Sequence, residues 1–277
     1  MQGGNDVVYP GVISTLLPTQ RMCRYRADRS PACNLVDMSK AGLNMDDIKI
    51  RYCFNLGQER HEVFDLQLDG RSLEVINIPC RNLPPWTRLE FHQCSHCPLD
   101  SEAYPDCPVA VNLALVIGRF DHVFSHDKVD LEVITDERHV SLHTTVQRGI
   151  SSLLGLLFAA SGCPHTAYLK PMARFHLPLA SKEDTIFRAA GMYFLGQYFL
   201  RKAGKKNDLE LDGLKKIYAN LHLINKKIAE RVRSATQTDS SVNAVILLDM
   251  ITHLMPFIIE DHLDEIRHLF TPYFLDT

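Results

Sequence analysis

The sequence predicts an α+β fold, with an antiparallel sheet in the N-terminal part of the domain and mainly helices after it. Two observations predict this fold: apolar and polar residues alternate in several segments before residue 146, and apolar residues recur at three- and four-residue steps after it. A third observation is that prolines and a short basic stretch precede the first alternating segment. We therefore expect a flexible lead-in over residues 1–45 and a single domain over 46–277, β-rich over 46–145 and helical over 146–277.

Strict alternation identifies the predicted strands. Ile48 to Leu56 is the clearest case, because its even-numbered residues are apolar or aromatic and its odd-numbered residues are mostly polar. The segment before the cysteine-rich loop is predicted as an antiparallel meander, and a second hairpin is predicted beyond it. The further predicted strands are Phe64–Asp69, Leu73–Ile78, a short extended piece Trp86–Phe91, Val129–Val133 and Val140–Thr144.

Start and stop signals delimit the predicted helices. Pro108 can open a helix, since proline is tolerated in the first turn, and Thr144 to Gln147 fits a capping box before an apolar run to Ala160. Ser181 with Asp184 begins another helix. Further predicted helical segments are that helix to about Lys202, an amphipathic helix from Leu214 to Val232, and a last helix capped by Asp239–Ser241 and kinked or ended by Pro256.

The apolar segment Val242–Ile259 is nearly long enough to span a membrane. It contains Asn243, Asp249 and His253, and a carboxylate in the middle of a bilayer is costly. We therefore interpret it as a buried helix near the core and expect no membrane partner.

Composition is that of an ordinary globular protein. The 277 residues are 45 % hydrophobic and 23 % charged, with a formal net charge of -3, which gives no reason to expect nucleic-acid binding. The N-terminus lacks the basic start and long apolar run of a signal peptide. We therefore expect a cytoplasmic, reducing location, where clustered cysteines serve as ligands or redox groups rather than as disulfides.

Four cysteines form the main candidate site. Cys94 and Cys97 have the Cys-x-x-Cys spacing, nine residues separate Cys97 from Cys107, and Cys163 comes after a predicted helix end. Thiolates at this spacing bind zinc or an iron–sulfur cluster. The sequence therefore predicts a metal site of Cys94, Cys97, Cys107 and Cys163 that joins the β-rich and helical parts, with zinc preferred and an iron–sulfur cluster as the alternative.

Other interpretations of these cysteines stay open at the sequence level. They could be small buried apolar residues, or Cys94 and Cys97 could form a thiol–disulfide pair, although the βαβ context of a thioredoxin-like motif is not seen. If only three cysteines bind, His165 could supply the fourth ligand. Further candidate ligands are His92, His96 and His176, whereas Cys23, Cys33, Cys53 and Cys80 are assigned no role.

Two further groups of polar residues could form sites. The segment 163–178 is rich in functional groups, and Lys170 with Arg174 could hold an anion. Asp249 and His253 are four residues apart on one predicted helix face and could form a buried polar pair. The sequence carries no P-loop, no dinucleotide-binding glycine motif, no nucleophile elbow and no His-Glu-x-x-His.

Two stretches carry a family resemblance. They are Phe91-His-Gln-Cys94-Ser-His-Cys97-Pro-Leu with Cys107-Pro-Val-Ala, and Ser161-Gly-Cys163-Pro-His165-Thr through Met172-Ala-Arg-Phe-His176-Leu-Pro. From about residue 46 onward the chain resembles an uncharacterised bacterial domain family of unknown function. The resemblance implies a bacterial cytoplasmic protein and no particular mechanism.

We therefore expect a non-enzymatic metal-binding protein with structural zinc, whose helical half serves as an interaction or sensing surface. The rival hypothesis is an enzyme or redox sensor that uses the same cysteines, with His165, His176 or Arg174 lining a pocket. A third is a homodimer through the amphipathic helix between Leu209 and Arg233.

Overall fold

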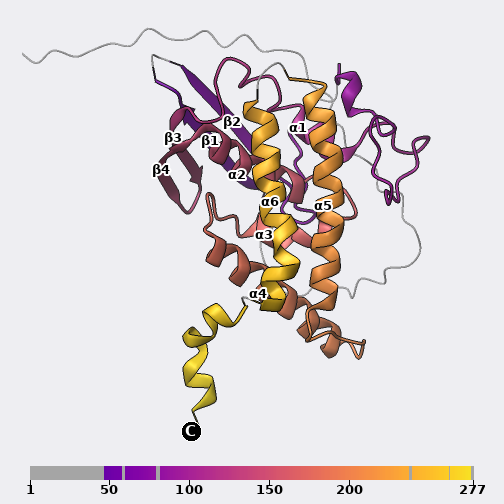
Figure 1. The fold of residues 1–277 in the computed structure, drawn as a ribbon. Helices are drawn as coiled ribbons and strands as arrows, with labels where there is room; N and C mark the ends of the chain where they lie inside the picture. The colour runs from indigo at the N-terminus through magenta and orange to yellow at the C-terminus, as the bar shows by residue number, and fades with distance from the viewer. Residues whose placement is uncertain (1–46, 58–59, 79–81, 237–238, 262, 276–277) are drawn as a thin grey trace, which may run out of the picture.

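The computed structural model describes residues 47–57, 60–78, 82–236, 239–261 and 263–275. The predicted lead-in over residues 1–45 lies outside these ranges. The described part has the predicted α+β fold, with a four-stranded antiparallel sheet up to residue 145 and a mostly helical remainder (Figure 1).

The sheet has the strand order β2-β1-β3-β4. In it β1 pairs with both β2 and β3, so that Tyr52 lies between Phe64 and Val133. The alternation predicted from sequence is confirmed, since every second side chain of β1, β2 and β3 is buried on one face. The strands are β1 (Ile48–Asn55), β2 (His61–Leu68), β3 (Lys128–Thr135) and β4 (His139–Thr145).

The predicted strand Leu73–Ile78 is wrong. Leu73 has φ of 58°, and the only bridge in this segment pairs Val75 with Leu68. Instead of continuing a ladder, Val75 donates its N–H to the carbonyl of Ala160, and the Asn77 side chain bonds the β2 backbone. The predicted meander is therefore also wrong, because the second neighbour of β1 is β3.

The predicted extended piece Trp86–Phe91 is not a strand either. Pro84 and Pro85 introduce a 3-10 turn, η1 (Pro85–Thr87), in which Thr87 donates its N–H to the Pro84 carbonyl. Proline fixes φ and supplies no N–H, which favours a turn over a ladder here.

The helical part confirms the predicted helices at most of their positions. Ser181 and Asp184 form the capping box that the sequence indicates, each side chain accepting from the other residue's N–H. The helices are α1 (Pro108–Leu113), α2 (Val146–Ala159), η2 (Ala167–Leu169), α3 (Lys170–Arg174), α4 (Lys182–Lys202), α5 (Asp212–Arg233), α6 (Ser240–Asp261) and η3 (Leu263–Phe274).

The capping box predicted at Thr144 does not form. The preceding strand runs on to Thr145, whose side chain makes no capping bond. The first N–H groups of α2 are satisfied by backbone instead, since Val146 donates to the carbonyl of Asp127 and Gln147 to that of Ser125. A neighbouring chain segment thus replaces the side-chain cap.

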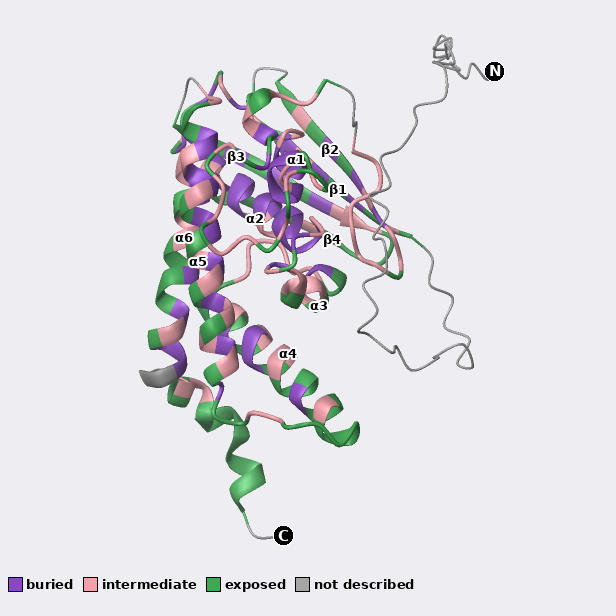
Figure 2. Cartoon of the chain, turned by 90° about the vertical axis from the view of Figure 1, so that its right-hand side faces the viewer, coloured by how far each residue is buried: buried purple, intermediate pink, exposed green. Residues whose placement is uncertain are grey.

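Helix α2 lies in the middle of the molecule. The apolar face of the sheet covers one side of it, and α6 packs on the other, with α5 beside α6 (Figure 2). Most of its residues are therefore buried, including Ile150, Leu153, Leu154 and Leu157. The core is a single cluster that reaches from Tyr52 and Phe54 on β1 through α2 to the inner face of α6.

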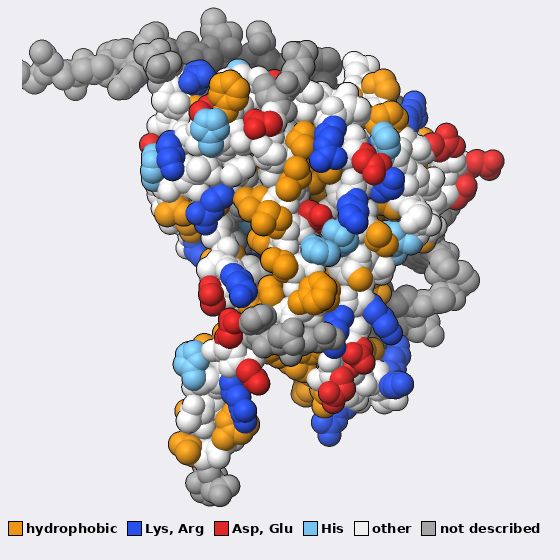
Figure 3. Space-filling view, viewed as in Figure 1, with side chains coloured by type: hydrophobic (Ala, Val, Ile, Leu, Met, Phe, Trp, Pro, Cys, Tyr) orange, Lys and Arg blue, Asp and Glu red, His pale blue; other side chains and the backbone are white. Residues whose placement is uncertain are grey.

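Helix α6 is only partly buried, which corrects the predicted buried helix. One described helix, Ser240–Ile259, is long and apolar enough to cross a membrane, and 33 % of that segment is buried. Its inner face packs on α2 and α5. Its outer face exposes Met250, Leu254 and Phe257, and hydrophobic side chains run down this side of the molecule (Figure 3). Pro256 lies inside the helix and does not end it.

Glycine at position 149 lets α2 approach the sheet closely. A Cβ added there would lie 2.7 Å from Cε1 of the buried Phe54. We expect Gly149→Ala to destabilise the protein by about 1–3 kcal/mol through overpacking, measured by urea unfolding. Gly155→Ala on the same helix is the matched control, because its nearest contact would be an ordinary 3.7 Å to Leu248. It should be neutral or stabilise by up to about 1 kcal/mol; equal effects of the two substitutions would contradict the close approach at Gly149.

Candidate metal centre

The first three cysteines belong to a loop whose two ends are tied together. Arg88 and Asp106 form an isolated antiparallel bridge, and Cys107 donates its N–H to the carbonyl of Thr87 at 2.7 Å. The Thr87 hydroxyl also donates to Asp106 at 2.9 Å. The loop therefore closes on itself, and Cys107 stands at its base.

Within the loop, Cys94 and Cys97 form one turn. The N–H of Cys97 donates to the carbonyl of Cys94 at 3.0 Å, so the two side chains start from adjacent points of the same bend. Cys107 is the residue before α1; burial raises the pKa of its thiol, whereas Arg231 and the nearby backbone N–H groups of Ala110 and Val109 act in the opposite direction. Backbone N–H groups that point at a sulfur stabilise its thiolate form.

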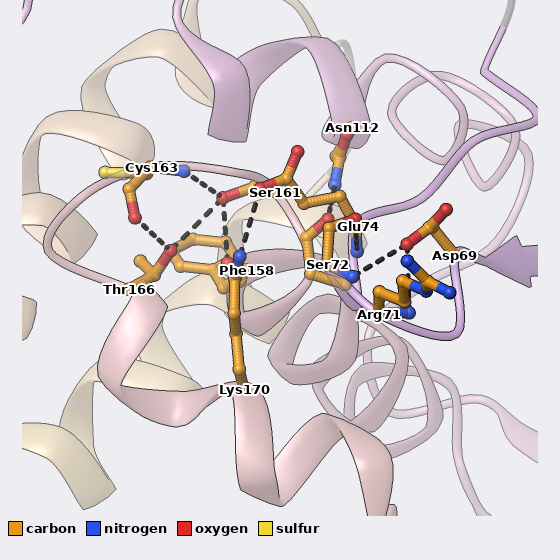
Figure 4. A network of polar contacts seen from close by, with 11 residues as sticks. Asp69, Arg71, Ser72, Glu74, Asn112, Phe158, Ser161, Cys163, Thr166 and Lys170 are labelled. Carbon is orange, nitrogen blue, oxygen red and sulfur yellow. Dashed lines mark hydrogen bonds and ion pairs between the residues drawn. The ribbon is translucent and has the colours of Figure 1, made fainter. Parts of the chain in front are cut away.

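Cys163 follows the end of α2 in a turn that is held rigidly. Gly162 has φ of 81°, and the N–H of Cys163 donates to the Ser161 hydroxyl at 3.3 Å. That hydroxyl in turn donates to the Phe158 carbonyl, and Thr166 donates to the carbonyl of Cys163. Figure 4 shows the sulfur of Cys163 pointing away from this network, which leaves it free to face another group.

Two histidines place the Cys163 turn against the Cys94–Cys97 turn. Nε2 of His165 lies 2.9 Å from the backbone oxygen of His96, and the two imidazole rings are 4.3 Å apart. Since His96 stands between Cys94 and Cys97, the segments that are far apart in sequence are in direct contact.

Electrostatic interactions join all four cysteines. Burial, and after it the neighbouring Cys107, Cys97 and Cys163, raise the pKa of Cys94 to about 12. Burial likewise raises the pKa of Cys163 to about 11, with Cys107 and Cys97 acting in the same direction against two backbone N–H bonds. The four side chains that the sequence singles out thus lie close enough to influence one another.

The four sulfurs do not form a finished metal cage. Among the residues that the structure describes, no group of three or more Cys, His, Asp or Glu side chains has the arrangement of a metal site. A tetrahedral shell needs sulfurs about 2.3 Å from the ion, so side-chain rotation would have to bring them together. The prediction that these four residues bind one metal ion therefore stays a prediction.

Arg231 is the residue of this site that the sequence analysis missed. It lies in the last turn of α5, is 2 % exposed, and donates to the backbone oxygens of Trp86, Arg88 and Leu89 at 2.6–2.8 Å. Burial lowers the pKa of Arg231, whereas Cys107, Cys94 and Cys97 raise it. No carboxylate of the described residues pairs with it. Its position seven residues after Ile224, within the apolar stripe of α5, is the signal that could have revealed it.

The histidines differ in their availability as ligands. His92 is occupied by Glu230 at 3.0 Å, and His176 hydrogen-bonds Tyr52 in a different part of the molecule. His165 uses Nε2 to hold the neighbouring turn. Burial and the adjacent His165 ring lower the pKa of His96, and neither of its ring nitrogens has a hydrogen-bond partner of normal geometry among the described residues. His96 is therefore better placed than His165 to act as a spare ligand.

The polar residues of segment 163–178 and of α6 have other partners than those predicted. Lys170 pairs with Glu74 at 3.0 Å, so Lys170 and Arg174 do not form a free anion site. Asp249 accepts from Nδ1 of His222 on α5 at 2.8 Å rather than pairing with His253. The His253 ring packs on that of His222 instead.

Comparison with known proteins identifies the family of this chain. A family model described as a domain of unknown function, DUF6901, matches residues 48–271. The chain therefore belongs to the DUF6901 family, which confirms the resemblance to a domain family of unknown function. No curated protein and no solved structure matches the chain.

The raised thiol pKa values predict an alkaline loss of stability in metal-free, reduced protein. Folded Cys94 and Cys163 have pKa values of about 12 and about 11, above the ordinary value of about 8.5 that applies after unfolding. Their contribution is complete below about pH 8.5 and disappears as the pH rises toward 11. Urea unfolding between pH 8 and 10.5 should show a steeper decline for the wild type than for a Cys94→Ala/Cys163→Ala variant. Equal slopes would rule out this contribution.

Proposed function

We propose that the protein is a zinc-binding protein in which Cys94, Cys97, Cys107 and Cys163 hold one structural zinc ion. The ion would fasten the cysteine-rich loop to the turn that follows α2. The observation that carries this proposal is the buried Arg231, which bonds three carbonyls of the cysteine-rich loop, interacts electrostatically with Cys107, Cys94 and Cys97, and pairs with no carboxylate within the described residues.

The charges favour an anionic centre at this place. A guanidinium stays protonated in proteins, and a buried charge without a counter-charge is costly. Four neutral thiols offer Arg231 no counter-charge. When one Zn²⁺ displaces four thiol protons, the net charge of the site falls by two, and the positive charge of Arg231 offsets one of these negative charges. Metal binding would therefore supply the counter-charge that the buried arginine needs.

The chemistry of the thiols favours a metal over a redox pair. Thiol nucleophiles depend on a lowered pKa, whereas burial raises the pKa of Cys94, Cys107 and Cys163. A zinc ion binds the deprotonated form, and the N–H groups directed at Cys107 and Cys163 support it. Four sulfur ligands would close the shell, which suits a structural role rather than catalysis at the metal.

An iron–sulfur cluster held by the same four cysteines is the second candidate, since its ligand chemistry is the same. Either centre requires free thiols, and the five described cysteines form no disulfide. We therefore propose a reducing compartment, the bacterial cytoplasm, as the location of the protein.

Elemental analysis of anaerobically purified protein tests the proposal directly. We expect about one zinc per chain and no visible absorption. Cys163→Ser should reduce zinc retention and lower the melting temperature, because the ligand that joins the two parts is lost. Cys53→Ser is the matched control, because Cys53 lies on β1 away from the cluster, and it should retain full zinc.

Two results would contradict the zinc proposal. If the protein contains iron and sulfide and shows a broad visible absorption band, the centre is an iron–sulfur cluster and not zinc. Protein without metal, whose melting temperature does not change when zinc is added, would eliminate a metal centre altogether.

Arg231 provides an independent test of the charge argument. Arg231→Met should weaken zinc binding by about tenfold or more, the scale seen when partners of metal ligands are removed. Arg231→Lys, which keeps the charge, should recover part of the affinity. Arg233→Met is the control, because Arg233 is exposed two residues further on. Competition with a chromophoric chelator measures the affinity, and circular dichroism confirms folding. Equal affinities of the Met and Lys variants would show that charge is not what Arg231 contributes.

A further inference from the structure

A cavity of about 370 Å³ lies among the helices, away from the cysteines. Its walls come from α2, α4, α5 and α6 together with the segment around α3, which lies behind α6 in Figure 1. Cavities of this size bind small molecules in many proteins. Most of its lining is apolar, including Leu156 and Ala159 of α2, Leu221 of α5, and Leu247 and Leu248 of α6.

The charged residues around this cavity are all basic. Arg148, Lys182 and Arg188 line it, and no Asp or Glu does so among the described residues. Lys182 has an acidic partner at 3.8 Å, Glu265 of η3, whereas no ion pair is formed by Arg148 or Arg188 within the described part of the chain. The cavity thus offers positive charge next to an apolar interior.

Tyr218 and Arg188 supply polar groups that the protein leaves partly unused. Tyr218 is 4 % exposed and lines the cavity, yet its hydroxyl forms no hydrogen bond with any described residue. Arg188 lies near it and uses Nη2 for the carbonyls of Met172 and Phe175 at 3.0 and 2.8 Å. Its Nε and Nη1 have no partner among the described residues. The Tyr218 hydroxyl is open to the cavity, where a ligand oxygen could accept a hydrogen bond from it.

Two hydroxyls of the wall are already engaged. The Ser152 hydroxyl contacts Tyr52 and accepts from the N–H of Leu179. Thr252 donates to the carbonyl of Leu248. Tyr218 and Arg188, which interact electrostatically, therefore present free donors together at one end of the cavity, and we assign the head group to that end.

We propose that this cavity binds a molecule with an apolar body and a single anionic head group, a carboxylate or a phosphate monoester. Tyr218 and Arg188 would donate to the head group, while the apolar walls on α2 and α6 would enclose the body. This site is separate from the proposed zinc centre and does not depend on it.

Calorimetric titration of the full chain with four probes of equal chain length tests the proposal, each below its micellar concentration. Decanoate and decyl phosphate carry the two anionic head groups, decanol is neutral, and decyltrimethylammonium is cationic. We expect one site per chain for at least one anion, binding at least about tenfold weaker for decanol, and no binding of the cation. The better anion identifies the head group. Equal binding of decanol, or binding of none of the probes, would overturn the proposal.

Tyr218→Phe separates ligand binding from folding. Because the hydroxyl bonds no described residue, the variant should keep the wild-type melting temperature. It should bind the anionic probe about tenfold more weakly, since a hydrogen bond to a charged group is lost. Tyr193→Phe is the control, because that hydroxyl bonds Asp208 outside this cavity, and its probe affinity should be unchanged. Unaltered affinity in Tyr218→Phe would refute the assigned head-group end.

Discussion

The burial of α2 on both sides is the constraint on which the rest of this structure depends. The helix covers the apolar face of the sheet and at the same time supports α6, so neither layer has a core without it. Both candidate sites are built from it. Its C-terminal end carries the rigid turn that holds Cys163, and its outward side forms a wall of the cavity. A shift of α2 would therefore disturb the sheet, the cysteines and the cavity together.

The proposed zinc centre and the proposed ligand site in the cavity each depend on a polar group that lacks a suitable protein partner. At the cysteines, a buried guanidinium bonds three carbonyls and still lacks a charged partner unless the thiols ionise. In the cavity, the Tyr218 hydroxyl faces open space and has no protein partner among the described residues. Each position offers a polar group that a bound ion or molecule could pair with, which is why these two positions carry the functional proposals.

Local sequence patterns predicted most strands and helices and singled out the four cysteines. The predictions that were wrong or missing have physical causes. Alternation identified β1 to β4, and Ser181 identified the start of α4, because these signals depend on neighbours in sequence. The segment at Val75 looked like a strand but bonds the end of α2 instead. Arg231 was missed because its partners are backbone carbonyls more than a hundred residues away. The contact between His96 and His165 likewise depends on how α2 docks, which no local pattern encodes.

The distribution of the four cysteines along the chain has a consequence for folding. Cys94, Cys97 and Cys107 are close in sequence, so bringing them together costs little loop-closure entropy, whereas Cys163 closes a much longer loop. In the proposed site, three thiolates could capture the ion early, and the fourth would join only after α2 has docked. The completed shell would then act as a cross-link that restricts the unfolded ensemble, much as a disulfide does in oxidising surroundings.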